Sequence, residues 1–271
     1  MAIPIGQAAE SSVVVRPALD LTFVGHATVR IETAGIRILT DPFLRQQLGP
    51  LVRHGPPPDL DTLGDVDMIV ISHGHPDHFD LASLGAVAGR PLIVLPRGLA
   101  ARARRAVRGD VIEVSADERI EFGRIAITAV PARHWITPGA PPAQPLGYLL
   151  DVGTTVYFAG DTGRFPAMRR LRGAVDVALL PIWTWGPHLG PGHLGPRSAA
   201  EVLVDIEPAV AVPIHWGTLY PRQLHRVWRG PLEEPGDRFA AHAARLAPAV
   251  DVRVLLPGER TTIGGPVLIR P

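Results

Sequence analysis

Apolar residues recur along the chain in short runs that are bounded by Gly, Pro and Asp. Many runs are apolar at successive positions, which is typical of strands that are buried on both faces. They predict strands at 19–24, 28–32, 36–40, 68–71, 92–95, 111–114, 125–130, 148–151, 155–158, 177–180, 210–214 and 252–255. Apolar residues spaced by three and four predict helices at 81–88, 98–107, 198–206 and 237–246. Many strands with fewer helices favour an α/β fold in which helices cover sheets.

Two Pro-rich stretches, 54–59 and 137–145, interrupt this pattern and predict loops, because proline cannot continue a strand or a helix. Neither stretch marks a domain boundary, and no internal repeat of roughly 20–50 residues is present. A chain of 271 residues is therefore expected to form a single domain over 1–271, with residues 1–17 as an N-terminal arm.

The amino-acid composition limits which partners and which metal ligands are expected. Hydrophobic residues make up 46% of the chain and charged residues 20%, which is enough apolar surface for a core. The 27 basic and 26 acidic residues are interspersed without a basic block, so nucleic acid is not an expected partner. With no cysteine, any metal must be held by His and carboxylates. No secretion leader and no apolar stretch of ~18 residues is apparent, which predicts a cytoplasmic protein without a transmembrane segment.

Four predicted strands are followed shortly by a residue type that binds metals. The strands at 68–71, 125–130, 155–158 and 210–214 lead to His73, His134, Asp161 and His215, respectively. Ligand-binding groups in α/β folds gather at the carboxyl ends of strands, where loops vary while the sheet stays rigid. The four residues are therefore candidates for one site.

The densest cluster of such side chains is the run from His73 to His78, with three imidazoles and one carboxylate in six consecutive residues. Packing explains it poorly, because His and Asp rarely occupy a core unless they are paired. Positions 73 and 75 can point the same way from an extended turn, while Asp77 and His78 can face a second ion. The alternative interpretation is a solvated loop before a helix that Asp80 caps.

The number of ligands supports two ions. A two-metal site needs about three protein ligands per ion and a bridging carboxylate. The run at 73–78 supplies four ligands, and His134, Asp161 and His215 complete the set. Each of these three alone would more readily be a hydrogen-bonded loop residue.

In chain order, these seven residues resemble the motif of the metallo-β-lactamase superfamily, His-x-His-x-Asp-His followed by a distant His, Asp and His. The resemblance spans about residues 20–217. It implies a four-layer αββα sandwich. It also implies one metal on His73, His75 and His134, and another on Asp77, His78 and His215, with Asp161 bridging.

Shorter motifs resemble the branch that contains N-acyl-phosphatidylethanolamine phospholipase D and ascorbate-6-phosphate lactonase. They are Phe23–Thr28, Leu39–Pro42, Phe158–Gly163 and Pro213–Thr218. The segment Pro131–Trp135 favours the phospholipase side, which implies a small-molecule or lipid-like ester substrate. In that group a His before a Pro-containing helix start lies near the substrate, and His193 in Gly192–Pro196 occupies the similar place.

The resemblance implies two divalent ions, with zinc expected and manganese or iron as alternatives. Such ions lower the pKa of a shared water toward ~7 and give a hydroxide nucleophile. Asp77 would hold this hydroxide and take its proton, and His193 would stabilise or protonate the leaving oxygen, unless it is an ordinary loop His. The expected reaction is phospholipase D-like cleavage of a phosphodiester or related ester. Lactone or phosphate-ester hydrolysis on the same metals is an alternative, as is a non-catalytic metal-binding protein.

Three further features lie near the inferred site. Asp41 is either a carboxylate that orients a ligand imidazole from behind or a turn residue before Pro42. The resemblance would place His26 near the site, but it is expected to be a structural His satisfied by the backbone, and it is not counted as a ligand. Trp183 and Trp185 form either an apolar wall for substrate, a subunit contact in a homo-oligomer, or ordinary core packing.

Overall fold

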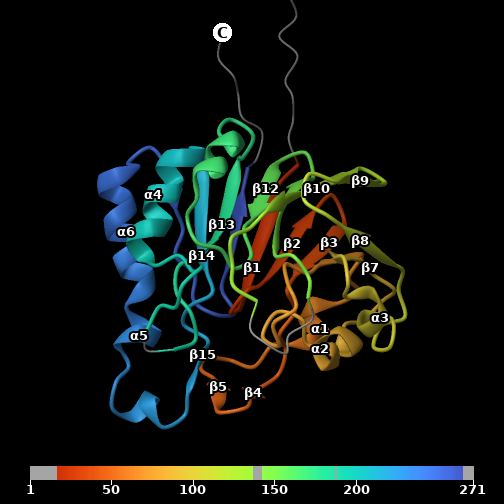
Figure 1. Ribbon diagram of the computed structural model, residues 1–271, viewed down its shortest axis with the longest axis horizontal. Coiled ribbons are helices and arrows are strands. Elements are labelled where there is room, and N and C mark those ends of the chain that lie inside the picture. Colours follow the sequence, from red (N-terminus) through yellow and green to blue (C-terminus); the bar gives the residue numbers. More distant parts are fainter. Residues whose placement is uncertain (1–16, 137–141, 187, 265–271) are drawn as a thin grey trace, which may run out of the picture.

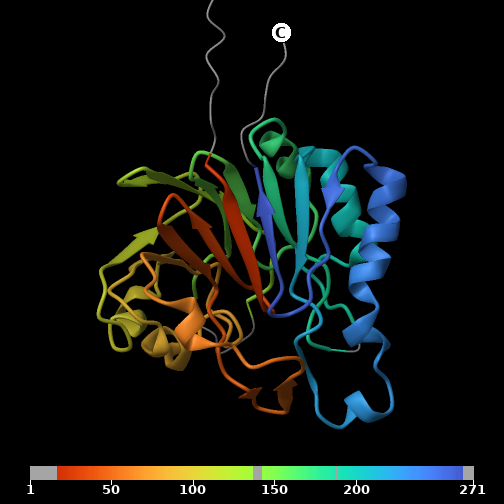
Figure 2. The same cartoon turned by 180° about the vertical axis from the view of Figure 1, so that it is seen from behind.

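Two large β-sheets face each other at the centre of the computed structural model, which describes residues 17–136, 142–186 and 188–264 (Figures 1 and 2). The predicted arm at 1–17 lies outside these ranges except for its last residue, and the predicted loop at 137–145 lies partly outside them. The Pro-rich stretch at 54–59 is a loop, as predicted.

Each large sheet combines parallel and antiparallel strands. Across the first sheet the order is β17 (Arg260–Ile263), β1 (Leu19–Gly25), β2 (Thr28–Thr33), β3 (Ile36–Thr40), β6 (Met68–Val70), β7 (Leu92–Pro96) and β8 (Val111–Val114). Across the second it is β16 (Asp251–Val252), β14 (Val210–Ile214), β13 (Val177–Pro181), β12 (Thr155–Phe158), β11 (Leu146–Asp151), β10 (Ile125–Pro131) and β9 (Arg119–Phe122). The parallel pairs run from β3 to β8 and from β12 to β16.

Successive side chains of a strand point to opposite faces of the sheet, and in the central strands both faces are buried. Met68 and Val70 of β6 belong to the central core between the sheets, whereas Ile69 and Ile71 belong to a second core under the helices. These side chains are almost completely buried, and each such burial contributes about 1.5–3 kcal/mol to folding. The runs of successive apolar residues therefore reflect strands with two buried faces, as predicted.

Helices form the two outer layers (Figure 1). The first sheet is covered by α1 (Leu60–Leu63), α2 (Leu81–Ala86) and α3 (Ala100–Ala103), and the second by η1 (Pro166–Leu171), α4 (Pro196–Ile206) and α6 (Pro235–Leu246). This arrangement confirms the predicted four-layer αββα sandwich. Within the described ranges, no helix has the length and apolar character that crossing a membrane requires.

A small third sheet was not predicted. It joins β4 (Gln47–Leu48), β5 (Leu51–Arg53) and β15 (Leu219–Pro221), and it lies at the lower edge of the sandwich near α5 (Gly230–Glu233). The 3₁₀ turn η2 (Leu224–Arg226) follows β15. Strands of two or three residues leave no periodicity to read from sequence, and they are stabilised here by a separate core around Phe43.

Two predicted elements are much shorter than expected, whereas those at 68–71 and 81–88 end only one and two residues early, respectively. The helix predicted at 98–107 is limited to α3, because the arginines at 102, 104, 105 and 108 have no acidic residue at helical spacing. The strand predicted at 252–255 is confined to β16, which pairs with β14 at Asp251 and Val252, and the Arg253 side chain donates to Thr261 Oγ1 and the Thr262 carbonyl.

The sheets touch directly at the edge where the parallel strands end. The Leu146 amide donates to the Ser72 carbonyl at 2.9 Å, and the Tyr148 hydroxyl donates to the Ile71 carbonyl at 2.8 Å. Gly160, which follows β12, has φ +57°, and a Cβ at this position would overlap the Cβ of Ser72. Only glycine allows this approach, which brings Asp161 next to the His73–His78 loop.

Gly160→Ala is therefore expected to destabilise the protein by roughly 2–5 kcal/mol, the sum of a left-handed backbone and a steric clash. Gly123→Ala is the matched control, because Gly123 has φ +60° and no atom within 4 Å of an added Cβ. Denaturant unfolding of both variants measures the difference, and equal losses would show that the sheets do not depend on close contact at Gly160.

Candidate metal centre

The predicted run lies in the loop between β6 and α2. His73, Asp77 and His78 are buried and His75 is partly buried. The amides of His78 and Phe79 both donate to the His75 carbonyl, which tightens the loop into a turn. Asp80 caps α2 by accepting from the Ser83 amide at 2.9 Å, so the cap and the cluster occur together.

The first group of imidazoles combines this loop with the end of β10. His73 Nε2 lies 2.9 Å from His75 Nδ1, and His134 Nε2 lies 3.0 Å from the same His75 atom. The three nitrogens are close enough to one another to hold a single ion.

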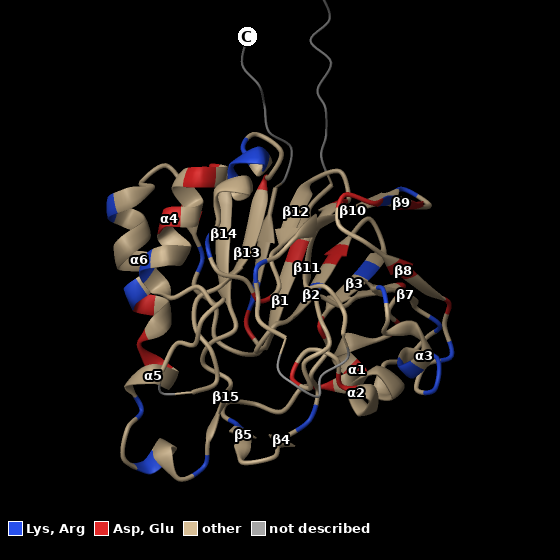
Figure 3. Ribbon diagram, viewed as in Figure 1, with Lys and Arg blue, Asp and Glu red and all other residues tan. Residues whose placement is uncertain are grey.

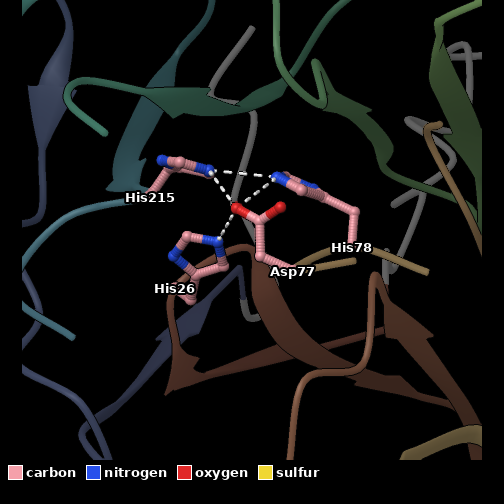
Figure 4. Close-up of side chains that lie close together, drawn as sticks. All are labelled: His26, Asp77, His78 and His215. Atoms are coloured by element: carbon pink, nitrogen blue, oxygen red, sulfur yellow. Dashed lines mark hydrogen bonds and ion pairs between the residues drawn. The ribbon is translucent and has the colours of Figure 1, made fainter. Parts of the chain in front are cut away.

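The second group consists of Asp77, His78 and His215 (Figure 4), and its His78 ring lies 4.2 Å from the His73 ring of the first group. His78 Nε2 and His215 Nε2 are 3.0 Å apart, and Asp77 Oδ2 is 3.6 Å from His78 Nε2 and 3.9 Å from His215 Nε2. Asp161 reaches both groups: its Oδ2 is 3.9 Å from His134 Nε2, and its Oδ1 is 3.2 Å from His215 Nε2. The structure thus brings together all seven predicted ligands.

Three of the candidate ligand histidines form a hydrogen bond through Nδ1, on the side of the ring that points away from the cluster. This bond determines which ring nitrogen carries the proton. His134 Nδ1 donates to the Gly192 carbonyl at 3.0 Å, and His78 Nδ1 donates to Asp41 Oδ2 at 2.6 Å. His73 Nδ1 lies 2.9 Å from Ser72 Oγ, whose own proton goes to Asp41 Oδ2. In a neutral imidazole the other nitrogen then carries the lone pair, so each Nε2 presents a lone pair to the centre.

Asp41 is accordingly much more than a turn residue. It follows β3, is fully buried, and accepts from the Ser72 amide at 2.7 Å as well as from the Ser72 hydroxyl and His78. It therefore supports one imidazole in each group, directly for His78 and through Ser72 for His73.

Burial and mutual charge set the ionisation of the cluster. Burial lowers the pKa of His73 and His215 well below the usual value, which keeps both rings neutral. Burial would raise the pKa of Asp77 and Asp161, but the neighbouring imidazoles hold it well below its usual range. For His78, the surrounding carboxylates outweigh burial and raise the pKa well above its usual value, so this ring would release its Nε2 proton when a cation binds.

Neutral imidazoles and ionised carboxylates are the donor set that divalent cations prefer. Among the described residues, Asp161 Oδ1 is buried without a hydrogen-bond partner. A carboxylate oxygen in that situation is costly unless a cation compensates it. The residues present therefore fit a pair of divalent metal ions.

The predicted substrate contact, His193, also reaches the cluster. It lies just before α4, its Nε2 is 3.5 Å from Asp161 Oδ2, and its ring is 4.7 Å from that of His134. Its Nδ1 is 3.2 Å from the carbonyls of Gly190 and Pro191. Burial would lower the pKa of His193, but the bond to Asp161 raises it above the usual value.

The expectation for His26 is wrong in one respect. The His26 carbonyl does bond to the backbone, at the His215 amide, but its ring is not satisfied by the backbone: His26 Nε2 lies 3.0 Å from Asp77 Oδ2. The buried ring is also 4.0 Å from that of His215. The sequence signal was the motif around residues 23–28 that resembles the phospholipase branch, but it did not indicate which groups the ring contacts.

A cavity of about 650 Å³ opens onto the cluster. At its inner end it is lined by His75, Asp77, His134, Asp161 and His193, and elsewhere mostly by apolar residues that include Leu48, Pro50, Leu51, Pro76, Trp135 and Trp185. Trp185 is thus a wall of the cavity. Trp183 is partly buried and donates to the Gly186 carbonyl at 3.1 Å, which holds the loop that carries Trp185.

Comparisons with known proteins agree with this architecture. The family described as "Beta-lactamase superfamily domain" matches residues 36–216. A UPF0173 metal-dependent hydrolase of Methanopyrus kandleri is 32% identical and is matched over 89% of this chain and 98% of its own. A mitochondrial N-acyl-phosphatidylethanolamine-hydrolyzing phospholipase D of Saccharomyces cerevisiae is 30% identical over 73% of this chain, but only 47% of that protein is covered.

A solved structure of a metallo hydrolase from the archaeon Ignicoccus hospitalis has the same fold. It superposes with a TM-score of 0.69 at 23% identity, over 91% of this chain and 98% of that one. The extent of the family match and the whole-length relationship to the Methanopyrus protein confirm the resemblance that the motifs indicated. The chain belongs to the β-lactamase superfamily, and it is a metal-dependent hydrolase of the metallo-β-lactamase fold.

Proposed function

We propose that this hydrolase binds two divalent metal ions, zinc in the first instance, and cleaves a phosphodiester or related ester in the manner of a phospholipase D. The observation that carries the proposal is the pair of adjacent ligand groups that share Asp161. In this proposal one ion is held by His73, His75 and His134, the other by Asp77, His78 and His215, and Asp161 contacts both.

When bound, such ions would lower the pKa of a coordinated water and polarise the ester oxygen under attack. The protein contributes the base. Asp77 lines the cavity, and its carboxylate is kept ionised by the imidazoles around it. It is the group that orients the attacking water and accepts its proton.

His193 acts on the leaving group. Its ring lines the same cavity, and the carbonyls around Nδ1 together with Asp161 favour the protonated form. Because its pKa is raised, the ring carries a proton that it can donate to the leaving oxygen. Asp77 and His193 thereby form a base and acid pair.

The cavity walls indicate the class of substrate. Among the described lining residues there is no arginine, and the chain contains no lysine. A phosphomonoester dianion is normally held by such side chains, often by a bidentate Arg. An ester whose substituents are apolar and uncharged, such as Trp135, Trp185 and Leu48 would contact, fits this cavity better than a sugar phosphate does. The name of the yeast relative agrees with a lipid-like ester.

The metal assignment predicts that Asp41→Asn weakens binding of both ions by about 10–100-fold, because the amide cannot support the imidazoles as the carboxylate does. Ser72→Ala is expected to weaken only the ion on His73. Asp80→Asn is the matched control, since this buried carboxylate caps α2 and bonds to Ser83 and Arg45. Metal titration against a chromophoric chelator measures all three, and wild-type affinity in Asp41→Asn would reject the assignment.

The reaction predicts that Zn- or Mn-loaded protein hydrolyses bis-p-nitrophenyl phosphate and apolar esters, and that chelation abolishes turnover. Asp77→Ala should lower kcat by at least roughly 10²–10⁴-fold, because it removes the proposed general base and also a ligand of the second ion. The exposed Glu121→Gln serves as control. Protein with both ions bound that hydrolyses neither these substrates nor a panel of lactones would be a binding protein instead, whereas activity on lactones alone would favour the lactonase alternative.

Esters with different leaving groups test whether His193 acts as the general acid. His193→Ala should lower kcat by roughly 10²-fold for an alkyl ester, whose leaving oxygen needs a proton, and far less for a p-nitrophenyl ester. His188→Ala is the control, because His188 lines the same cavity. Equal losses on both ester types would assign His193 to substrate binding alone.

A further inference from the structure

The backbone at His26 is held in an unusual conformation. His26 follows β1 at the bulge where the register with β2 shifts, and it has φ +59°, in the left-handed region that non-glycine residues seldom adopt. Its amide donates to Thr218 Oγ1 at 2.7 Å, and its carbonyl accepts from the His215 amide at 2.7 Å. Such conformations persist where the surroundings fix them, and they concentrate at functional sites.

The segment just before His26 is fixed as well. Gly25 has φ +123°, and a Cβ there would lie 2.7 Å from Arg53 Nη1. The buried Arg53 guanidinium donates to the carbonyls of Val24 and Phe43, which tie β1 to the loop after β3. The position of His26 is therefore imposed by main-chain and side-chain contacts from three different segments.

This backbone directs the His26 ring at Asp77 (Figure 4). The distance from His26 Nε2 to Asp77 Oδ2 is 3.0 Å, and both side chains are buried. An ionised carboxylate only accepts hydrogen bonds, so the hydrogen of this contact is on His26 Nε2. The ring is 4.0 Å from His215 and 5.3 Å from His78, which wedges it between the second ligand group and the first sheet.

We propose that His26 is a positioning residue: its Nε2–H holds the Asp77 carboxylate in the orientation that the second metal and the attacking water require. The inference rests on the proposed ligand groups. Asp41 orients two ligand imidazoles by hydrogen bonds without itself being a proposed ligand. The proposal gives His26 the corresponding role for the Asp77 carboxylate. The competing assignment is a fourth ligand of the second ion, because a ring nitrogen of His26 is also within 4.8 Å of the ligand atoms of Asp77, His78 and His215.

Two substitutions separate the hydrogen bond from the ring. His26→Phe keeps an aromatic ring against His215 and removes the donor, whereas His26→Gln removes the ring and keeps an N–H. We expect His26→Phe to weaken the second metal equivalent by about 10–100-fold and to leave the first unchanged. His26→Gln should regain most of the affinity. His54→Ala is the control, because His54 is partly buried and stacks on His225, and it belongs to none of the groups of candidate ligands among the described residues.

The measurements are metal titration, the absorption spectrum of the Co²⁺-substituted protein, and kcat against KM on any ester that the wild type cleaves. A positioning role predicts that kcat falls in His26→Phe with little change in KM, and that both variants keep the wild-type Co²⁺ spectrum. Wild-type affinity in His26→Phe, or no recovery in His26→Gln, would overturn the proposal. A Co²⁺ spectrum altered in both variants would assign His26 as a ligand instead.

These readouts distinguish the inference from the proposed reaction. Metal affinity and the Co²⁺ spectrum need no substrate, so a wild-type protein that binds two ions but hydrolyses nothing would reject the reaction and leave the test of His26 intact. Circular dichroism establishes that each variant is folded. If His26→Phe does not fold, the comparison of His26→Gln with wild type decides, and a loss of second-site affinity beyond tenfold in His26→Gln counts against the proposal.

Discussion

The carboxylate of Asp41 is the interaction on which the geometry of the site depends. It is fully buried at the end of β3, and it accepts hydrogen bonds from the Ser72 amide, the Ser72 hydroxyl and His78 Nδ1. These bonds join the carboxyl ends of two neighbouring strands and select the tautomer of His73 and His78. Because one of these rings belongs to each ligand group, a single buried charge sets the direction of lone pairs in both. Burial raises the pKa of Asp41, and its bonds to His78 and Ser72 oppose that shift.

The site is built on backbone that is strained locally and stabilised by the sheets. Six described non-glycine residues have positive φ, and three of them, His26, Asp41 and His215, belong to the centre. Each lies directly after a β-strand or one residue beyond it, where the ladder hydrogen bonds of the sheet hold the chain. Left-handed conformations cost on the order of 1–3 kcal/mol each. Burial of the extensive core between the sheets offsets this cost. The strained residues are therefore held in a rigid arrangement.

Much of this could be predicted from the sequence. Successive apolar residues predicted the buried strands, and strand ends followed by His or Asp predicted which loops meet, because parallel strands bring their carboxyl ends to one edge. The small sheet of β4, β5 and β15 was missed, since its strands are too short to show a period. The contact of His26 with Asp77 was missed because it joins residues 51 positions apart and depends on a bulge and a positive φ. Neither feature has a local signature beyond Gly25.

The polar and apolar residues of the cavity lie in different parts of it, which indicates different roles in substrate binding and in catalysis. Its inner end presents imidazoles and carboxylates, whereas Leu48, Pro50 and Trp185 farther out offer apolar contact without a charge. Apolar contact of this kind is equal in the ground state and the transition state, so it improves binding and orients the ester without changing the barrier. In the proposed reaction, the barrier falls through groups whose interactions strengthen as charge develops, namely Asp77, His193 and the ions that the ligand groups fit. Selectivity among esters is therefore expected to reside in the outer loops, and rate in the residues that the strands hold.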